Sequence, residues 1–244
     1  MGGLLSMKRL ALPTSGILDL CRPRHSPLLG GTILQGVQTM KLFYATHTCS
    51  LAPHIALKEA GAEYSTVRIS FADSEQRSPG YLAINPKGRV PALLTDRGIL
   101  TETPAMLTFI AQSFPRSGLA PLDDLFAFAK LQEFNSYLCS TLHVAHAHRE
   151  RGHRWADDPV AIAEMQRKVP QSVSECYDLI ERDMLKGPWV MGNTYTICDP
   201  YLFTLAQWLE KDGVEPSRIP RVIEHRSRMS ERPATRMAIA EEFA

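Results

Sequence analysis

Cys49 is the residue whose type and position best suit chemistry. It stands between an apolar run at residues 42–44, typical of a strand, and residues 50–60, whose composition favours a helix ending at Gly61. A thiol at the start of a helix faces unpaired backbone N–H groups and the positive end of the helix dipole, which can favour a thiolate, its own or that of a ligand. The simpler explanation is a small residue before a helix, so a chemical role for Cys49 needs support from the rest of the chain.

A group of histidines is the second candidate for chemistry: His143, His146, His148 and His153. On a helix, His143 and His146 share a face, whereas His148 points elsewhere. A zinc ion needs three or four converging ligands, and no acidic or thiol side chain has matching spacing. We therefore predict no metal site and expect the helix that carries these histidines to line a cleft between domains.

The composition excludes several classes of partner. The 244 residues include 27 basic and 26 acidic side chains, for a net charge of +1, which gives no indication of nucleic acid or an acidic membrane surface. No apolar run is long enough to cross a bilayer. The five cysteines are scattered without CxxC spacing, which favours a reducing compartment, and we predict a cytoplasmic protein.

Two kinds of region must position these residues. Residues 40–115 predict the order βαβαββα, an α/β layer, with strands near 40–44, 63–69, 90–94 and 99–101. A proline-rich linker at 115–121 follows. The remainder predicts helices only, near 123–148, 159–185, 196–211, 219–230 and 233–242, with a charged loop at 149–158. At the start of the third of these helices, Asp199 is expected to accept a hydrogen bond from the N–H of Thr196.

Residues 1–39 differ from the rest, with Lys8, Arg9, Arg22 and Arg24 against one acid, Asp19. A secretory signal is one interpretation, but its apolar core would stop at Pro13, and a transit segment is another. We interpret residues 1–39 as a disordered extension or a mis-assigned start, residues 40–116 as the first domain and 123–244 as an all-helical domain.

Four stretches, in order, resemble the bacterial beta class of cysteine-containing glutathione S-transferases. They begin at Met40 (MKLFY, then CSLA), Tyr81 (YLAINPKGRVPAL), Leu100 (LTETPA) and Trp189 (WVMG, then TICDPYLF). The resemblance covers residues 40–244. It implies a thioredoxin-like N-terminal domain (βαβαββα), an all-α C-terminal domain and a homodimer.

The resemblance also implies a glutathione site. The Val90–Pro91 peptide would be cis, and the backbone of Val90 would pair with the cysteinyl part of glutathione. Glu102 would take the ligand's ammonium and Thr103 its γ-glutamyl carboxylate. The full set of implied glutathione-binding residues is Cys49, Phe71, Arg89, Val90, Pro91, Glu102, Thr103, Ser136 and Ser140.

Cys49 and His143 are the catalytic candidates that the resemblance implies. Neutral His143 could accept the thiol proton, and as a cation it would favour the thiolate. Cys49 would lie beside the glutathione sulfur as a possible disulfide partner. The chain departs from the beta-class pattern at four positions. Two lysines of the pattern are replaced by Ser74 and Val144, a glutamine by Arg89 and an asparagine by Ser136.

The expected function is conjugation of the glutathione thiol to small hydrophobic electrophiles, with thiol–disulfide exchange through Cys49 as an additional option. Glutathione would be the co-substrate, without a metal. The altered polar residues favour the alternative of a non-catalytic binding or regulatory protein that keeps the same fold.

Overall fold

The structure is a computed structural model that describes residues 40–243. The predictions made for residues 1–39 lie outside the described residues. The boundaries predicted for the two domains also stay predictions.

A four-stranded mixed sheet forms the first domain, in the order β2-β1-β3-β4. Strand β1 (Met40–Tyr44) pairs in parallel with β2 (Tyr64–Arg68) and antiparallel with β3 (Ala92–Thr95), which forms a hairpin with β4 (Gly98–Thr101). These bounds agree with the expected strands within two residues. They confirm the thioredoxin-like fold.

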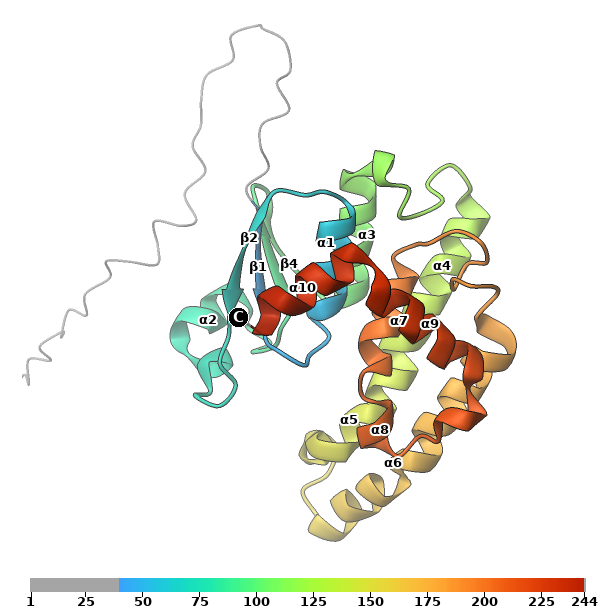
Figure 1. Ribbon diagram of the computed structural model, residues 1–244. Coiled ribbons are helices and arrows are strands. Elements are labelled where there is room, and N and C mark those ends of the chain that lie inside the picture. The colour runs from blue at the N-terminus through green and yellow to red at the C-terminus, as the bar shows by residue number, and fades with distance from the viewer. Residues whose placement is uncertain (1–39, 244) are drawn as a thin grey trace, which may run out of the picture. The chain divides into compact units, whose positions relative to one another are not determined.

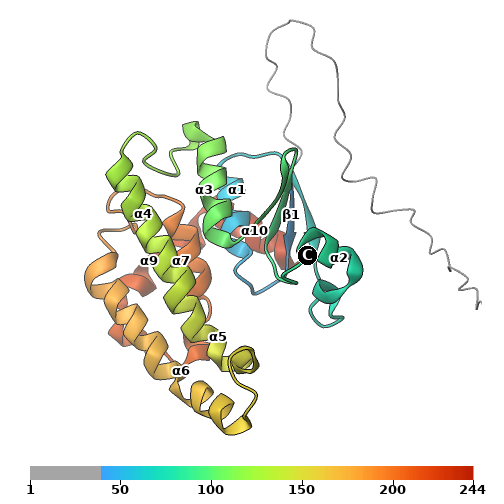
Figure 2. The same cartoon turned by 180° about the vertical axis from the view of Figure 1, so that it is seen from behind.

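Successive side chains of β1 point to opposite faces of the sheet and pack with different helices. Leu42 and its neighbours two residues away pack with α1 (Leu51–Glu59) and α3 (Thr103–Ser113), whereas Phe43 packs with Tyr81 of α2 (Pro79–Ile84). Figures 1 and 2 show α2 on the side of the sheet opposite α1 and α3.

The second domain is helical, as predicted. Its helices are α4 (Leu125–Tyr137), α5 (His143–Arg151), α6 (Pro159–Leu179), α7 (Cys198–Ala206), α8 (Leu209–Asp212), α9 (Pro220–Glu231) and α10 (Pro233–Phe243). A π-helical turn, Leu138–Leu142, joins α4 to α5, and a second one, Ile180–Met184, follows α6. Shorter 3-10 turns occur at Glu75–Arg77, Pro115–Ser117, Gly152–Arg154 and Pro216–Arg218.

Two predictions about helix ends are wrong. The segment expected as a charged loop at 149–158 is helical as far as Arg154, because α5 continues to Arg151 and a 3-10 turn follows. The helix expected to run to Lys211 breaks at Gln207 and Trp208 and resumes as α8.

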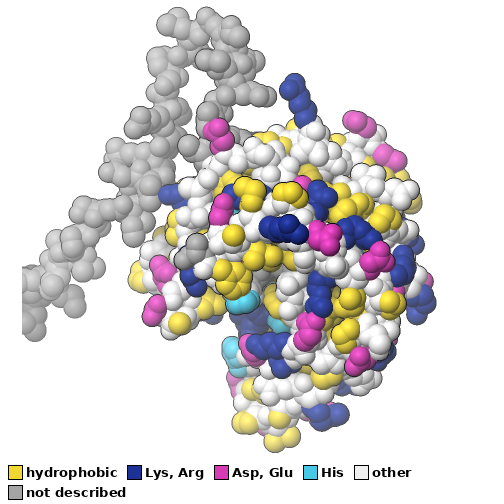
Figure 3. All heavy atoms as spheres, viewed as in Figure 1, with side chains coloured by type: hydrophobic (Ala, Val, Ile, Leu, Met, Phe, Trp, Pro, Cys, Tyr) yellow, Lys and Arg dark blue, Asp and Glu magenta, His cyan; other side chains and the backbone are white. Residues whose placement is uncertain are grey.

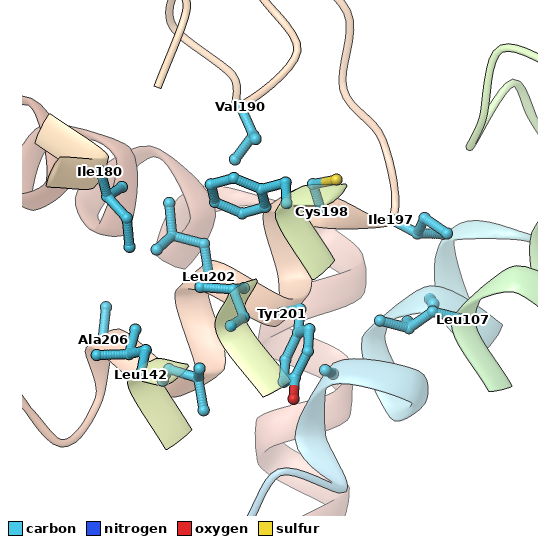
Figure 4. Packing of buried hydrophobic residues seen from close by; sticks show 14 of the residues in the cluster. Leu107, Leu142, Ile180, Val190, Ile197, Cys198, Tyr201, Leu202 and Ala206 are labelled. Carbon is cyan, nitrogen blue, oxygen red and sulfur yellow. The ribbon is translucent and has the colours of Figure 1, made fainter. Parts of the chain in front are cut away.

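Helix α7 is the centre of the core, since every one of its residues is buried. Tyr201, Leu202 and Ala206 of this helix lie among side chains from both domains, including Leu107 of α3 and Leu142 of the π-helical turn (Figure 4). The predicted bond at its start is confirmed, because Asp199 Oδ2 accepts from the N–H of Thr196 at 2.7 Å. Asp199 also accepts from the N–H of Val190 at 2.8 Å and contacts Nε2 of buried His225 at 3.0 Å.

The last helix, α10, lies against α1 of the first domain (Figure 1). The imidazole of His54 in α1 is fully buried and contacts the carboxylates of Glu241 and Glu242 at 3.1 and 3.2 Å. Lys58 pairs with Glu241 as well. These contacts connect the end of the described chain to the helix that follows Cys49.

Candidate glutathione site

A cleft of about 840 Å³ lies between the sheet domain and helices α5 and α8. Its volume is in the range of small-molecule sites, about 300–1,000 Å³. Figure 3 shows histidine and Lys or Arg side chains where this face of the molecule is hollowed. Eight of the predicted site residues line this interdomain cleft: Cys49, Phe71, Arg89, Val90, Pro91, Glu102, Thr103 and His143.

The Cys49 thiol lies in the cleft just before α1. Its Sγ lies 3.6 Å from the backbone oxygen of Val90, to which it is placed to donate. Burial raises the pKa of Cys49, and a hydrogen bond from Thr103 and the charge of Arg151 only partly oppose this. The alternative in which the helix start lowers the pKa of Cys49 itself is therefore wrong, because removal of the sulfur from water outweighs the helix dipole. The alternative in which it favours the thiolate of a ligand stays a prediction.

The Val90–Pro91 peptide is cis, as the resemblance implied. The chain before it is held by two hydrogen bonds to the carbonyl of Arg89, from Tyr81 Oη and Asn85 Nδ2, both at 2.7 Å. Gly88 has a φ of +58°, and a side chain there would meet Nη1 of Arg77 at 2.9 Å. The positive φ favours glycine at position 88, and Val90 lines the cleft.

Glu102 and Thr103 line the cleft from the same domain. Glu102 has a φ of 73°, in the left-handed region that non-glycine residues rarely occupy, and its carboxylate pairs with Lys87 Nζ at 2.5 Å. Thr103 is the first residue of α3 and is 5% exposed. Backbone strain of this kind concentrates at binding sites, where the surrounding structure holds it in place.

His143 begins α5, and Arg151 Nη2 donates to its Nε2 at 3.4 Å. Burial is the main cause that lowers the pKa of His143 to about 3, and the nearby charges of Arg151, His146 and other residues add to it. The imidazole is therefore neutral at ordinary pH, and the alternative in which it acts as a cation is wrong. Arg151 carries the positive charge at this position.

Ser136 and Ser140 do not join the site. Both are exposed and lie outside the residues that line the cleft, and Ser140 Oγ donates back to the carbonyl of Ser136 at 2.8 Å. The prediction placed them on the His143 side by α-helical spacing. The π-helical turn at Leu138–Leu142 adds residues to one turn, so positions before and after it no longer share the expected face.

Two of the other histidines, His146 and His148, pack against aromatic side chains, whereas His153 is exposed. His146 Nδ1 contacts the carboxylate of buried Asp212 at 2.7 Å, and its ring stacks on Trp208 with centroids 4.1 Å apart. His148 packs edge-on against Trp155. No group of three His, Cys, Asp or Glu side chains in residues 40–243 has the geometry of a metal site. Within the same residues, no helix is long and apolar enough to cross a membrane.

The sequence interpretation missed a set of cleft residues at the end of α5: Arg151, Arg154 and Trp155. They fall in the segment expected as a loop. The sequence signal for these residues was the arginines and the tryptophan close together in this segment, but only the direction of the helix brings them to the cleft that holds Cys49.

Comparisons with known proteins agree with this fold and site. The family model described as "Glutathione S-transferase, N-terminal domain" matches residues 38–112. "Glutathione S-transferase GstA" of Escherichia coli O157:H7 is 32% identical over 206 residues, which cover 83% of this chain and 98% of that protein.

Solved structures give the same result. A glutathione transferase homolog from Sulfitobacter with bound glutathione superposes with a TM-score of 0.81 and 41% identity, covering 84% of this chain and 99% of the other. A beta class glutathione S-transferase of Sphingomonas chungbukensis superposes with a TM-score of 0.71 and 31% identity, and the match covers 83% of this chain and 98% of the other. The chain therefore belongs to the glutathione S-transferase family, which confirms the prediction at the level of the family.

Proposed function

We propose that the protein conjugates the thiol of glutathione to an electrophile in the interdomain cleft. The observation that carries this proposal is the convergence of Cys49, Val90, Thr103 and Arg151 on one cleft of a family member whose solved relative holds glutathione. The residues come from both domains, so the site exists only in the folded chain.

Glutathione would bind along the sheet domain. Its γ-glutamyl carboxylate would accept from the start of α3 and from the hydroxyl of Thr103, while Glu102, shared with Lys87, would take the ammonium. The cysteinyl backbone would pair with Val90, and the glycyl carboxylate would face Arg89. Phe71 and Pro91 would bound this groove.

The sulfur of glutathione would lie near Cys49 and Arg151. The thiol loses its proton to solvent, the thiolate sulfur forms a bond to the electrophilic carbon, and the leaving group departs or the adduct takes up a proton. Arg151 lies near Cys49, and its fixed charge would stabilise a thiolate there. His143 would hold Arg151 in position through its Nε2.

Cys49 would serve as a neighbour of the substrate sulfur rather than as the attacking thiolate, since burial raises its pKa. Its place in the cleft suits attack on oxidised glutathione, in which Cys49 forms a mixed disulfide with one half and the other half leaves as reduced glutathione. Thiol–disulfide exchange therefore remains the second activity that we propose. A hydrophobic electrophile would contact Val144, Ala147 and Trp208 on the helical wall.

Three finer assignments belong to the same proposal. Assignment to the beta class is supported by the cysteine at position 49 and by the likeness to the Sphingomonas enzyme. A homodimer follows from the family resemblance, and a cytoplasmic location follows from the scattered cysteines without CxxC spacing. Both remain predictions.

Calorimetry with glutathione, followed by an assay with chlorodinitrobenzene, tests the proposal. Thr103→Val should weaken glutathione binding about tenfold, because the γ-glutamyl carboxylate loses one hydrogen bond. Thr108→Val is the matched control on the same helix, since the Thr108 hydroxyl contacts Gln132 at 2.8 Å outside the cleft. A protein that does not bind glutathione, or binds it without conjugation, would instead be the non-catalytic alternative.

A further inference from the structure

Four arginines converge on the interdomain cleft from two domains. Arg77 and Arg89 belong to the sheet domain, whereas Arg151 ends α5 and Arg154 ends the 3-10 turn after it. All four line the cleft. They lie close enough to affect one another. The pKa of Arg154 is lowered first by burial and then by the charges of Arg151, Arg89 and Arg77.

These four side chains lack acidic partners. Among residues 40–243, no carboxylate lies within 4.0 Å of their guanidinium nitrogens, whereas the cleft lysines Lys87 and Lys211 are paired with Glu102 and Glu150. Like charges held together without counter-charges repel one another, and a bound anion relieves that repulsion.

A simpler explanation covers only part of this cluster. Cations at the end of a helix interact favourably with its dipole, which accounts for arginines near the end of α5. The dipole of α5 does not explain why Arg77 and Arg89 of the other domain face the same space. Convergence from two domains indicates a ligand with more than one negative group.

Glutathione supplies part of that charge. It has two carboxylates and one ammonium, and in the binding mode proposed above one carboxylate lies at Thr103 and the other at Arg89, with Arg77 nearby. Arg151 is occupied by His143 and by the sulfur. Arg154 is then the cation left without an anion when glutathione is bound.

An aromatic surface adjoins Arg154. The next residue, Trp155, lines the cleft and is 47% exposed, and its indole is fixed by edge-on contact with His148, with centroids 4.6 Å apart. An exposed indole and a guanidinium that line the same cleft suit a planar ring that carries an acid group.

We infer that the electrophile conjugated by this protein is an anionic aromatic compound, with its acid group bound by Arg154 and its ring against Trp155. This inference rests on the proposed function and narrows its substrate class. It modifies the expectation of a purely hydrophobic electrophile, since the ring remains apolar but the acid group selects the substrate.

A pair of electrophiles tests the inference: chlorodinitrobenzene and the same ring with a carboxylate, chlorodinitrobenzoate. Each kcat/KM is divided by the rate constant of the uncatalysed reaction with glutathione, which removes intrinsic reactivity. The corrected ratio, anionic over neutral, should exceed one and fall as ionic strength rises.

Arg154→Gln should lower this corrected ratio about tenfold, through loss of one charge-assisted hydrogen bond, and Arg154→Lys should lower it less. Arg116→Gln, at an exposed arginine outside the cleft, is the control for loss of a positive charge. An unchanged ratio in Arg154→Gln would overturn the inference.

Two further measurements separate this inference from the proposed function. Calorimetry of Arg154→Gln should show wild-type glutathione affinity, and a comparable loss of that affinity would assign Arg154 to glutathione instead. Should neither electrophile be conjugated, the proposed function fails. Binding of unreactive dinitrobenzoate and dinitrobenzene to the glutathione-loaded protein then decides the inference, which is overturned unless the acid binds more tightly.

Discussion

Arg151 donates a hydrogen bond to Nε2 of His143 across 3.4 Å, and both side chains line the cleft that holds Cys49. The bond fixes the direction of the guanidinium and takes up the imidazole nitrogen that would otherwise accept a proton. It also keeps His143 neutral, because the adjacent positive charge adds to burial in lowering its pKa to about 3. The positive charge offered to a thiolate is thus that of an arginine, which does not titrate in the physiological range.

Replacement of Arg151 should raise the pKa of bound glutathione. Arg151→Gln removes the nearest fixed positive charge, and we expect a rise of about one pH unit in the thiol pKa. A pH titration of the ultraviolet thiolate absorbance of the complex measures it. Arg151→Lys should keep most of the effect, and Arg149→Gln is the control on the same helix, because Arg149 lies by Asp212 instead. Identical titrations for wild type and Arg151→Gln would show that this charge does not act on the sulfur.

Protonation of His143 should make acid destabilise the fold. Its pKa is about 3 in the folded chain and about 6.5 in an unfolded one, so below pH 6.5 the unfolded chain binds a proton that the folded chain does not. This contribution to stability is complete above pH 6.5 and is lost progressively as the pH falls toward 3.

Urea unfolding at pH 7 and pH 5 measures the effect. In His143→Gln, the decrease in the free energy of unfolding between these pH values should be smaller than in the wild type, by up to about 2 kcal/mol. His153→Gln is the control for loss of an exposed imidazole. Equal decreases in wild type and His143→Gln would refute the low pKa.

Cys49 is half-buried, and its thiol should not behave as an activated thiolate. Because burial raises its pKa, its alkylation by iodoacetamide at neutral pH should be slower than that of free glutathione, as peptide mapping can show. Cys49→Ala should abolish the mixed disulfide with oxidised glutathione and reduce conjugation by a smaller factor. Cys139→Ala, which removes another cleft thiol, is the matched control. Alkylation faster than that of glutathione would restore Cys49 as a thiolate nucleophile.

Loss of the Asp199 carboxylate should destabilise the helical domain. Asp199→Ala leaves the buried N–H groups of Val190 and Thr196 without their acceptor, and buried His225 without its carboxylate. We expect a cost of about 3 kcal/mol in the free energy of unfolding, measured in urea. Asp178→Asn, which removes an ion pair with Arg218 at the surface, should cost less than about 1 kcal/mol. A comparable cost for both variants would contradict the role assigned to the buried network.

The sequence by itself determined the local frame of this protein. The strand, turn and helix around Cys49, the hairpin between β3 and β4, and the bond from Thr196 to Asp199 were all predicted correctly. Each depends on interactions between residues a few positions apart, such as alternation, turn residues and helix caps, and these leave a direct pattern in the chain.

The tertiary structure decided which side chains meet Cys49 and what charge they carry. The π-helical turn at Leu138–Leu142 moved Ser136 and Ser140 away from the expected face, and the continuation of α5 brought Arg151 to His143. Burial then raised the pKa of Cys49 and lowered that of His143, against the expectations from residue type and helix position. These features depend on helix phase and on removal of groups from water, and both arise only when distant parts of the chain pack together.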